Sequence, residues 1–144
     1  MDGGQNVISA NVSGGVVVSV GSANNVILGN LIGTSADGAI SVANNLYGVV
    51  LGAAGGGNIV GGDTPNAGNR ISGGGGDGVR IENGTTLAVV QGNAIGIRAD
   101  GVPYGDTGYG VRVEAASSNT IGGFGQFEGN VIANDRIGVA VIGN

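Results

Sequence analysis

Asn69-Arg-Ile-Ser72 and Gly78-Val-Arg-Ile81 decide the fold, because both tetrapeptides recur along the chain. The first theme is Asn, any residue, Ile and a small residue, and it begins at Asn6, Asn30, Asn69, Asn93 and Asn130. The second theme is Gly, Val, any residue and an aliphatic residue, and it begins at Gly15, Gly48, Gly78, Gly110 and Gly138. Two motifs that return in a fixed order predict a solenoid in which each repeat is one coil.

Each theme is a short β-branched run bounded by Gly or Asn, which is typical of a strand and too short for a helix. A third such run lies between them in every coil, as in Val26-Ile-Leu and Val89-Val-Gln. The sequence therefore predicts an all-β parallel β-helix with three short parallel sheets and about four coils of roughly 30 residues. Residues 1–144 are expected to form one domain.

The two-residue period of a strand predicts which side chains face the core. In the Gly-Val strands, residues such as Val49, Leu51, Val79 and Ile81 are expected to face inward. In the Asn-x-Ile strands, an inward ladder is expected from the following residues: Ile8, Ile32, Ile71, Ile95 and Ile132.

The recurrent asparagines are expected to stack at the bend before each isoleucine. Asparagine tolerates a sharp bend, and its amide both donates and accepts hydrogen bonds. A column of stacked amides satisfies polar groups that would otherwise be buried without partners. We therefore predict an asparagine ladder made of Asn6, Asn30, Asn69, Asn93 and Asn130.

Loop lengths alternate from coil to coil. Long loops follow the Asn-x-Ile strand in the first and third coils, at 34–47 and 98–109, but precede it in the second and fourth, at 62–68 and 123–129. Asn6 lies 63 residues before Asn69, which lies 61 before Asn130. This pattern indicates a duplicated two-coil unit.

Composition excludes several functions. The chain has no Cys and no His, so thiolate catalysis, Ser-His triads and ordinary zinc sites lack their side chains. Five dispersed basic residues and a net charge of −5 argue against nucleic-acid binding. No apolar run reaches the length of a membrane span, and no targeting signal is recognised in this chain.

The segments Gly29-Asn-Leu-Ile-Gly-Thr34, Ile59-Val-Gly-Gly-Asp-Thr64 and Asp77-Gly-Val-Arg-Ile-Glu82 resemble the right-handed parallel β-helix repeats of bacterial secreted or surface proteins, whose fold is pectin-lyase-like. The resemblance covers nearly the whole chain. It implies an extracellular or cell-surface location, but the fold hosts both enzymes and adhesins, so it leaves the activity open.

Polysaccharide lyases of this fold typically carry calcium-binding acids and a basic residue on one sheet. The only comparable residues here are Arg80, Arg112, Glu82 and Glu114, on outward positions of the Gly-Val strands. They are the candidate catalytic residues of a lyase-like enzyme, with calcium as its cofactor. The alternative is a solvated face whose charges compensate one another.

Three aspartates are the candidate metal ligands: Asp37, Asp100 and Asp106. Asp37 and Asp100 each precede a glycine in a long loop, about 10 Å apart along the axis, and Asp106 is the residue that would complete a calcium site. Turn chemistry alone also explains an Asp-Gly pair. The interpretation with the better support therefore assigns no metal and no other cofactor.

We expect a structural or adhesive segment of an extracellular bacterial protein that contacts carbohydrate and has no catalytic activity of its own. The lyase-like enzyme is the alternative. No capping helix is recognised at either end, which favours a segment of a longer solenoid and self-association through its ends. Outward apolar residues Val17, Val50 and Ile142 are expected to add to that surface.

Overall fold

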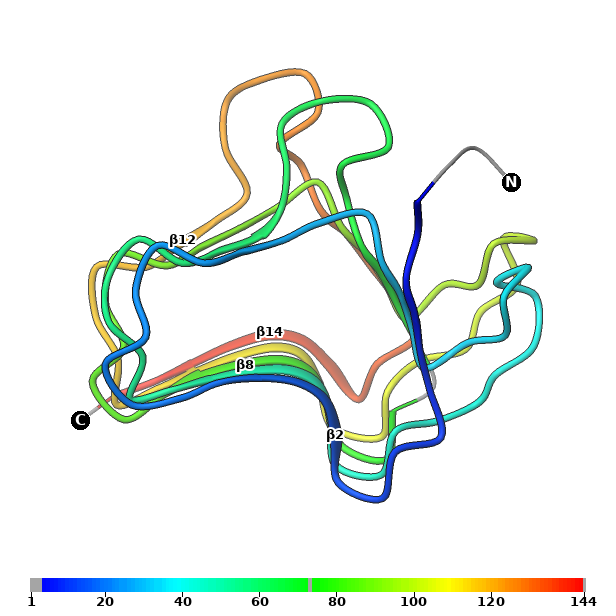
Figure 1. Ribbon diagram of the computed structural model, residues 1–144, viewed down its shortest axis with the longest axis horizontal. Helices are drawn as coiled ribbons and strands as arrows, with labels where there is room; N and C mark the ends of the chain where they lie inside the picture. Colours follow the sequence, from blue (N-terminus) through cyan, green and yellow to red (C-terminus); the bar gives the residue numbers. More distant parts are fainter. Residues whose placement is uncertain (1–3, 73, 144) are drawn as a thin grey trace.

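The chain winds as a parallel β-solenoid of about four coils in a computed structural model that describes residues 4–72 and 74–143 (Figure 1). Residues 1–3, 73 and 144 of the predicted domain lie outside the described residues. The described residues form 14 strands and no helix, and hence no helix that could cross a membrane. The predicted all-β architecture with three parallel sheets is confirmed.

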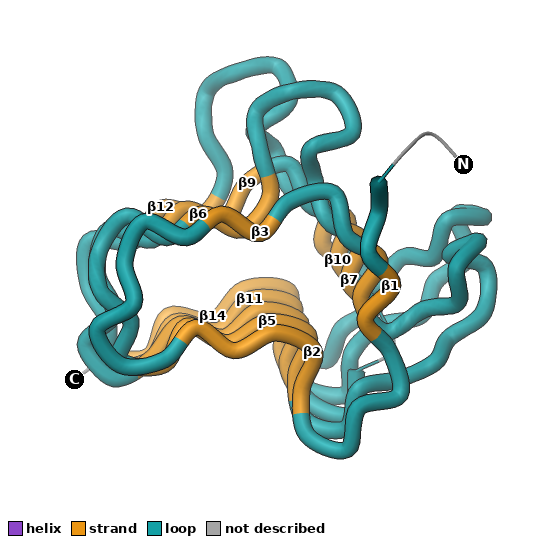
Figure 2. The backbone as a smooth tube through the Cα atoms, viewed as in Figure 1, coloured by secondary structure: helices purple, strands orange, loops and turns teal. Residues whose placement is uncertain are grey.

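Each sheet collects one recurrent strand from every coil (Figure 2). Sheet A carries the Asn-x-Ile theme in β1 (Val7–Ile8), β4 (Leu31–Ile32), β7 (Arg70–Ile71), β10 (Ala94–Ile95) and β13 (Val131–Ile132). Sheet B carries the Gly-Val theme in β2 (Gly14–Val18), β5 (Tyr47–Gly52), β8 (Asp77–Glu82), β11 (Tyr109–Glu114) and β14 (Ile137–Ile142). Sheet C contains β3 (Val26–Ile27), β6 (Ile59–Gly61), β9 (Val89–Gln91) and β12 (Thr120–Ile121).

The register follows the repeat. Ile32 pairs with Ile71 between β4 and β7, and Val49 pairs with Val79 between β5 and β8. Every pair of neighbouring strands is parallel and comes from successive coils. Equivalent positions of successive coils therefore stack on one another, and the same pattern of inward and outward side chains applies to each coil.

The core is the column of aliphatic side chains between the sheets. Leu51, Val79 and Ile81 are fully buried, as the strand period predicts. Ile32, Ile71 and Ile95 are also buried, and Ile8 and Ile132 pack against the core from the outer coils. Burial of each such side chain stabilises the fold by about 1.5–3 kcal/mol.

Among the apolar residues expected on the outward face of sheet B, one prediction is wrong. Val17 and Ile142 are 57% and 37% exposed, but Val50 is only 5% exposed. Val50 lies on a central strand between Val17 and Arg80 in the register. Neighbours on both sides cover it, including the long stem of an arginine, whereas β2 and β14 are the outer strands of the sheet.

The asparagine ladder is continuous. Nδ2 of each asparagine donates to Oδ1 of the asparagine in the next coil: Asn6 to Asn30 at 2.8 Å, Asn30 to Asn69 at 2.9 Å, Asn69 to Asn93 at 3.0 Å and Asn93 to Asn130 at 3.0 Å. Asn69 and Asn93 also donate to carbonyl oxygens of the preceding coils. Because both functions of each buried amide are used, the ladder fixes the bend before sheet A.

The alternating loops project at two corners of the coil (Figure 1). The loops that precede sheet A in the second and fourth coils project at one corner, and the loops that follow it in the first and third project at another. In the latter pair, the Ala99 amide donates to the Gly38 carbonyl oxygen at 2.9 Å. Because the loop lengths repeat every two coils, the two loops of each kind project at the same corner of the solenoid.

Candidate functional site

The charged residues of sheet B form a closed network. Arg80 pairs with Arg112 and Glu82 with Glu114 in the register of β8 and β11. Arg80 Nε and Glu82 Oε2 form an ion pair at 2.6 Å, although the angle between them is not that of a hydrogen bond. Arg112 Nη2 and Glu114 Oε2 form an ion pair at 2.7 Å. The diagonal contact from Arg80 Nη2 to Glu114 Oε2 is 3.6 Å. These pairs offset the repulsion between the stacked like charges.

Asp77 and Tyr109 complete this network, although the sequence did not single them out for it. Asp77 Oδ2 lies 3.8 Å from Arg112 Nη1 and 4.0 Å from Arg80 Nε. The Arg112 guanidinium lies over the Tyr109 ring at 5.3 Å from its centroid. Each arginine is therefore already neutralised by carboxylates within the sheet, which is the arrangement expected of a self-compensating face.

The three candidate metal ligands are not brought together. Asp37 Oδ1 accepts from the Ala39 amide at 3.0 Å, and Asp100 Oδ1 accepts from the Val102 amide at 3.0 Å. The Ser35 hydroxyl lowers the pKa of Asp37, and the Val102 amide lowers the pKa of Asp100. Both are exposed turn residues, as local turn chemistry predicts.

Asp106 lies elsewhere, buried before β11, where its Oδ1 accepts from the Gly74 amide at 2.5 Å. Over residues 4–72 and 74–143, no three acidic side chains cluster as a metal centre would require. Asp106 belongs to the stacked column of the coil, whereas the candidates Asp37 and Asp100 lie in surface turns.

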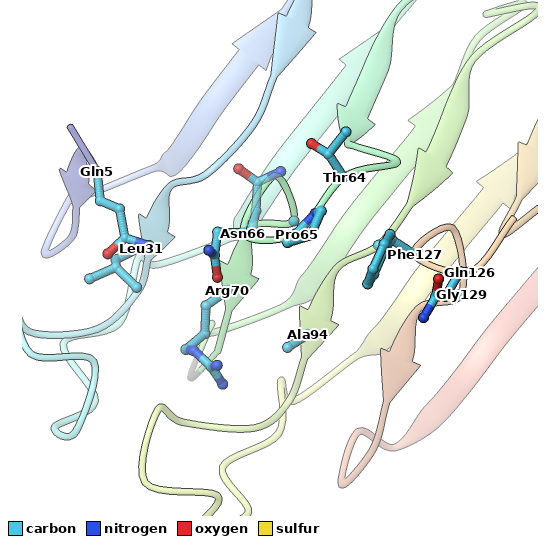
Figure 3. A pocket seen from close by; sticks show the side chains of 13 residues that line it. Gln5, Leu31, Thr64, Pro65, Asn66, Arg70, Ala94, Gln126, Phe127 and Gly129 are labelled. Carbon is cyan, nitrogen blue, oxygen red and sulfur yellow. The ribbon is translucent and has the colours of Figure 1, made fainter. Parts of the chain in front are cut away.

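A groove with a volume of about 360 Å³ lies over the outer face of sheet A (Figure 3). Its floor is formed by Leu31, Arg70 and Ala94, which are register neighbours on β4, β7 and β10. These residues alternate with the inward isoleucines and therefore face outward. The Arg70 guanidinium reaches across to the loop after β10, where Nη1 donates to the carbonyl oxygens of Ile97 and Arg98 at 3.1 and 2.9 Å.

The walls of the groove are the two long loops that precede sheet A. Thr64, Pro65 and Asn66 come from the loop between β6 and β7, and Gln126 and Phe127 from the loop between β12 and β13 (Figure 3). The loops stand two coils apart, so the short connection of the third coil passes between them. This spacing leaves room for a ligand above Ala94.

Gly92, in the short connection between the two loops, lies close to both of them. It adopts a φ of 68°, and its amide donates to the Glu128 carbonyl oxygen at 3.1 Å. A Cβ at this position would collide with the carbonyl oxygens of Gly62 and Phe127, one from each loop. Only glycine combines this backbone conformation with so little space.

The lining combines amide, hydroxyl and apolar groups. Amides outside the buried Asn69 of the ladder come from Gln5, Asn66 and Gln126, a hydroxyl from Thr64, and the aromatic ring from Phe127, which is 41% exposed. No described residue of the lining is acidic. The groove therefore offers hydrogen bonds and a ring face, but no carboxyl group for acid or base catalysis.

The groove residues were not identified from the sequence. The available signal was the long loops of the second and fourth coils, because loops at equivalent positions of a solenoid project at the same corner. Phe127 in one of these loops, in a chain with only two phenylalanines, was the other sign. Both features break the repeat, whereas the sequence argument followed the residues that keep it.

Comparison with known protein families, curated proteins and solved structures gave no significant match. The relation to pectin-lyase-like proteins of bacterial surfaces stays a prediction.

Proposed function

We propose that this chain is a structural, adhesive segment of an extracellular bacterial protein, and that it binds carbohydrate in the groove over sheet A without catalysis. The observation that carries the proposal is the lining itself: three amides outside the asparagine ladder, a hydroxyl, an arginine and an exposed aromatic ring surround one groove. Sites for sugars need such a mixture, because hydroxyl groups require donors and acceptors and the CH faces of a pyranose pack on an aromatic ring.

The groove favours a neutral or sparsely charged glycan. Arg70 is its single cation among the described lining residues, and Nη1 of that side chain is engaged by two carbonyl oxygens. A dense polyuronate needs several cations along its length, whereas a hydroxyl-rich glycan is matched by amides. The ladder below the floor is hydrogen-bonded from coil to coil, which favours a largely preformed surface for the glycan.

The lyase-like alternative finds less support. Its candidates Arg80, Arg112, Glu82 and Glu114 lie on sheet B, outside the groove lining, and each makes an ion pair with another member of the sheet. A general base needs access to the substrate proton, and a carboxylate held at 2.6–2.7 Å from a guanidinium is already engaged.

A binding screen tests the proposal. The purified chain is titrated with neutral and uronate oligosaccharides, and each mixture is also monitored for unsaturated products by ultraviolet absorbance. We expect binding without product formation, and a loss of affinity of about tenfold in Phe127→Ala, because the ring would no longer bury apolar area against the sugar, which is worth about 1.4 kcal/mol.

Phe124→Ala is the matched control, since Phe124 lies in the same loop, is fully exposed and is not part of the lining. It should bind like the parent chain. Equal losses in both variants would contradict the assignment of the groove. Turnover of a uronate polymer that disappears in Arg112→Ala would replace the proposal with the lyase-like alternative.

A further inference from the structure

A second stacked column, before sheet B, changes its chemistry along the molecule. The first contact between coils in this column joins two asparagines. Asn11 donates to Asn44 Oδ1 from its backbone N, at 3.1 Å, and from its Nδ2, at 2.8 Å. Later steps use carboxyl groups instead. The Gly74 amide donates to Asp106 Oδ1 at 2.5 Å, and the Asp106 amide donates to Asp135 Oδ1 at 2.7 Å. In each step Oδ1 accepts from the preceding coil.

The second oxygen of Asp106 stands where asparagine has its NH2 group. Asn44 Nδ2 lies 3.1 Å from the point that a Cβ atom would occupy at Gly15. Asp106 Oδ2 lies 2.7 Å from the corresponding point at Gly78. Gly15 and Gly78 are equivalent residues of β2 and β8, one coil before the side chain concerned. Asn44 Nδ2 uses this place to donate to the Ile8 carbonyl oxygen at 3.0 Å. An ionised carboxylate has no hydrogen to donate there.

Asp106 Oδ2 is buried and has no hydrogen-bond partner among the described residues, and the whole residue is only 3% exposed. Asp135 Oδ2 is likewise buried without a hydrogen-bond partner among the described residues. It lies 2.5 Å from the point that a Cβ atom would occupy at Gly110. An unpaired buried oxygen that carries charge is strongly destabilising, whereas a protonated one becomes a donor.

We propose that Asp106 is a proton-binding position in this column, where its neutral carboxyl group replaces an asparagine, and that loss of the proton destabilises the coils around β11. The column before sheet B is thus a pH-sensitive element, in contrast to the asparagine ladder before sheet A, whose amides do not titrate.

The charges around Asp106 are consistent with this assignment. Asp135 in the next coil and Asp77 on β8 are its acidic neighbours, and Arg80 and Arg112 make their ion pairs with Asp77 and the glutamates. Within residues 4–72 and 74–143, neither Asp106 nor Asp135 forms a salt bridge. Burial, together with the charges of Asp135 and Asp77, raises the pKa of Asp106 to about 7, although the hydrogen bond from the Gly74 amide opposes the shift. Burial also raises the pKa of Asp135.

The sign of the effect follows from proton linkage. Asp106 binds its proton more tightly in the folded chain than in the unfolded chain, where the pKa is near 3.8. Its contribution to stability is therefore complete below pH 3.8 and is lost as the pH rises toward about 7. The exposed residues Asp37 and Asp100 have lowered pKa values and act in the opposite direction, so a substitution is needed to isolate Asp106.

Urea unfolding between pH 4 and pH 8 of the parent chain, Asp106→Asn and Asp63→Asn tests the proposal. Asp63 is an exposed loop residue and controls for the loss of one negative charge. Over this range we expect the parent to lose up to about a thousandfold in its folding equilibrium constant relative to Asp106→Asn, since each unit of pKa is a factor of ten. Asp106→Asn should be the more stable at pH 8, and Asp63→Asn should follow the parent.

A carboxyl carbon NMR titration of the parent chain provides a second measurement that does not depend on any variant folding. The Asp106 resonance should titrate well above the range of ordinary aspartates. An Asp106 resonance that titrates near pH 4, or an Asp106→Asn chain with the pH dependence of the parent, would overturn the proposal.

Discussion

At the scale of single residues, Asn69 shows why one amino acid recurs so faithfully. Its Oδ1 accepts from the Asn30 backbone N at 3.0 Å and from Asn30 Nδ2 at 2.9 Å. Its Nδ2 donates to Asn93 Oδ1 at 3.0 Å and to the Ile27 carbonyl oxygen at 2.7 Å. Asn69 is 1% exposed, so water does not replace these bonds. No other side chain of similar size offers an acceptor and two donors in this arrangement.

Asn69→Ala should therefore reduce the free energy of unfolding by about 2–4 kcal/mol, because it leaves several buried donors and acceptors without partners. Urea denaturation followed by circular dichroism measures the loss. Asn6→Ala is the matched control: Asn6 is exposed and makes a single ladder bond, so its loss should be about 1 kcal/mol or less. Equal effects in the two variants would show that the ladder does not stabilise the interior of the solenoid.

Residues that repeat could be predicted from the sequence, and residues that depart from the repeat could not. The inward isoleucines and the asparagine ladder follow from spacing alone, because every coil obeys the same local rule. Asp106 was considered as a candidate calcium ligand because its residue type suggested that role. Its offset of four residues before Gly110, the same as that of Asn44 before Gly48, would have placed it in the column. For Asp106, the offset within the repeat is therefore a better guide to its place in the fold than its residue type.

At the scale of elements, the ends of the sheet C strands show how glycine permits close stacking. Gly61 at the end of β6 has a φ of 92°, and a Cβ there would overlap the Gln91 carbonyl oxygen of the next coil. Gly84, in the turn after β8, has a similar φ of 81° but open space around its Cβ position. The two glycines therefore share a backbone conformation and differ in their neighbours.

Gly61→Ala and Gly84→Ala separate these two effects. Gly84→Ala should cost about 1 kcal/mol in stability from backbone strain alone. Gly61→Ala should cost at least about 2 kcal/mol more, because the neighbouring coil has to move and ladder bonds lengthen. Thermal and urea unfolding of the two variants measure the difference. If Gly61→Ala were no worse than Gly84→Ala, contact between the coils at this corner would not limit the stacking.

The elements also show why the groove escaped prediction. The strand periods determine the floor residues Leu31, Arg70 and Ala94, since these must alternate with the inward isoleucines. The walls are loops, and the path of a loop depends on contacts such as that of the Gly92 amide with Glu128, which join different coils. A single sequence contains no rule for such contacts, although it does show which coils carry the long loops.

At the scale of the whole molecule, the two outer strands of sheet B bear exposed apolar groups. Val17 on β2 is 57% exposed, and Val141 and Ile142 on β14 are 75% and 37% exposed. Each of these strands also has one edge without a partner in the described sheet. A strand edge beside apolar side chains is a template for pairing with another strand.

We therefore propose that the isolated chain self-associates, with β14 of one copy adding to β2 of another. Sedimentation velocity should show larger species as the concentration rises, and more of them at high salt, because the net charge of −5 repels copies. Ile142→Lys should weaken the association, since a lysine on an edge disfavours pairing. Val102→Lys, on an exposed loop, serves as the control. A parent chain that stays monomeric at high concentration would contradict this proposal.

The central claim is that the repeated residues build the solenoid, whereas the loops that break the repeat form a non-catalytic carbohydrate site. Titration of isotope-labelled chain with the oligosaccharide that binds best, followed by amide NMR, tests it most directly. We expect saturable shifts confined to residues 64–70 and 126–129 and their neighbours on sheet A, with the oligosaccharide recovered intact. Shifts centred on Arg80 and Arg112, or cleavage of the oligosaccharide, would contradict the account.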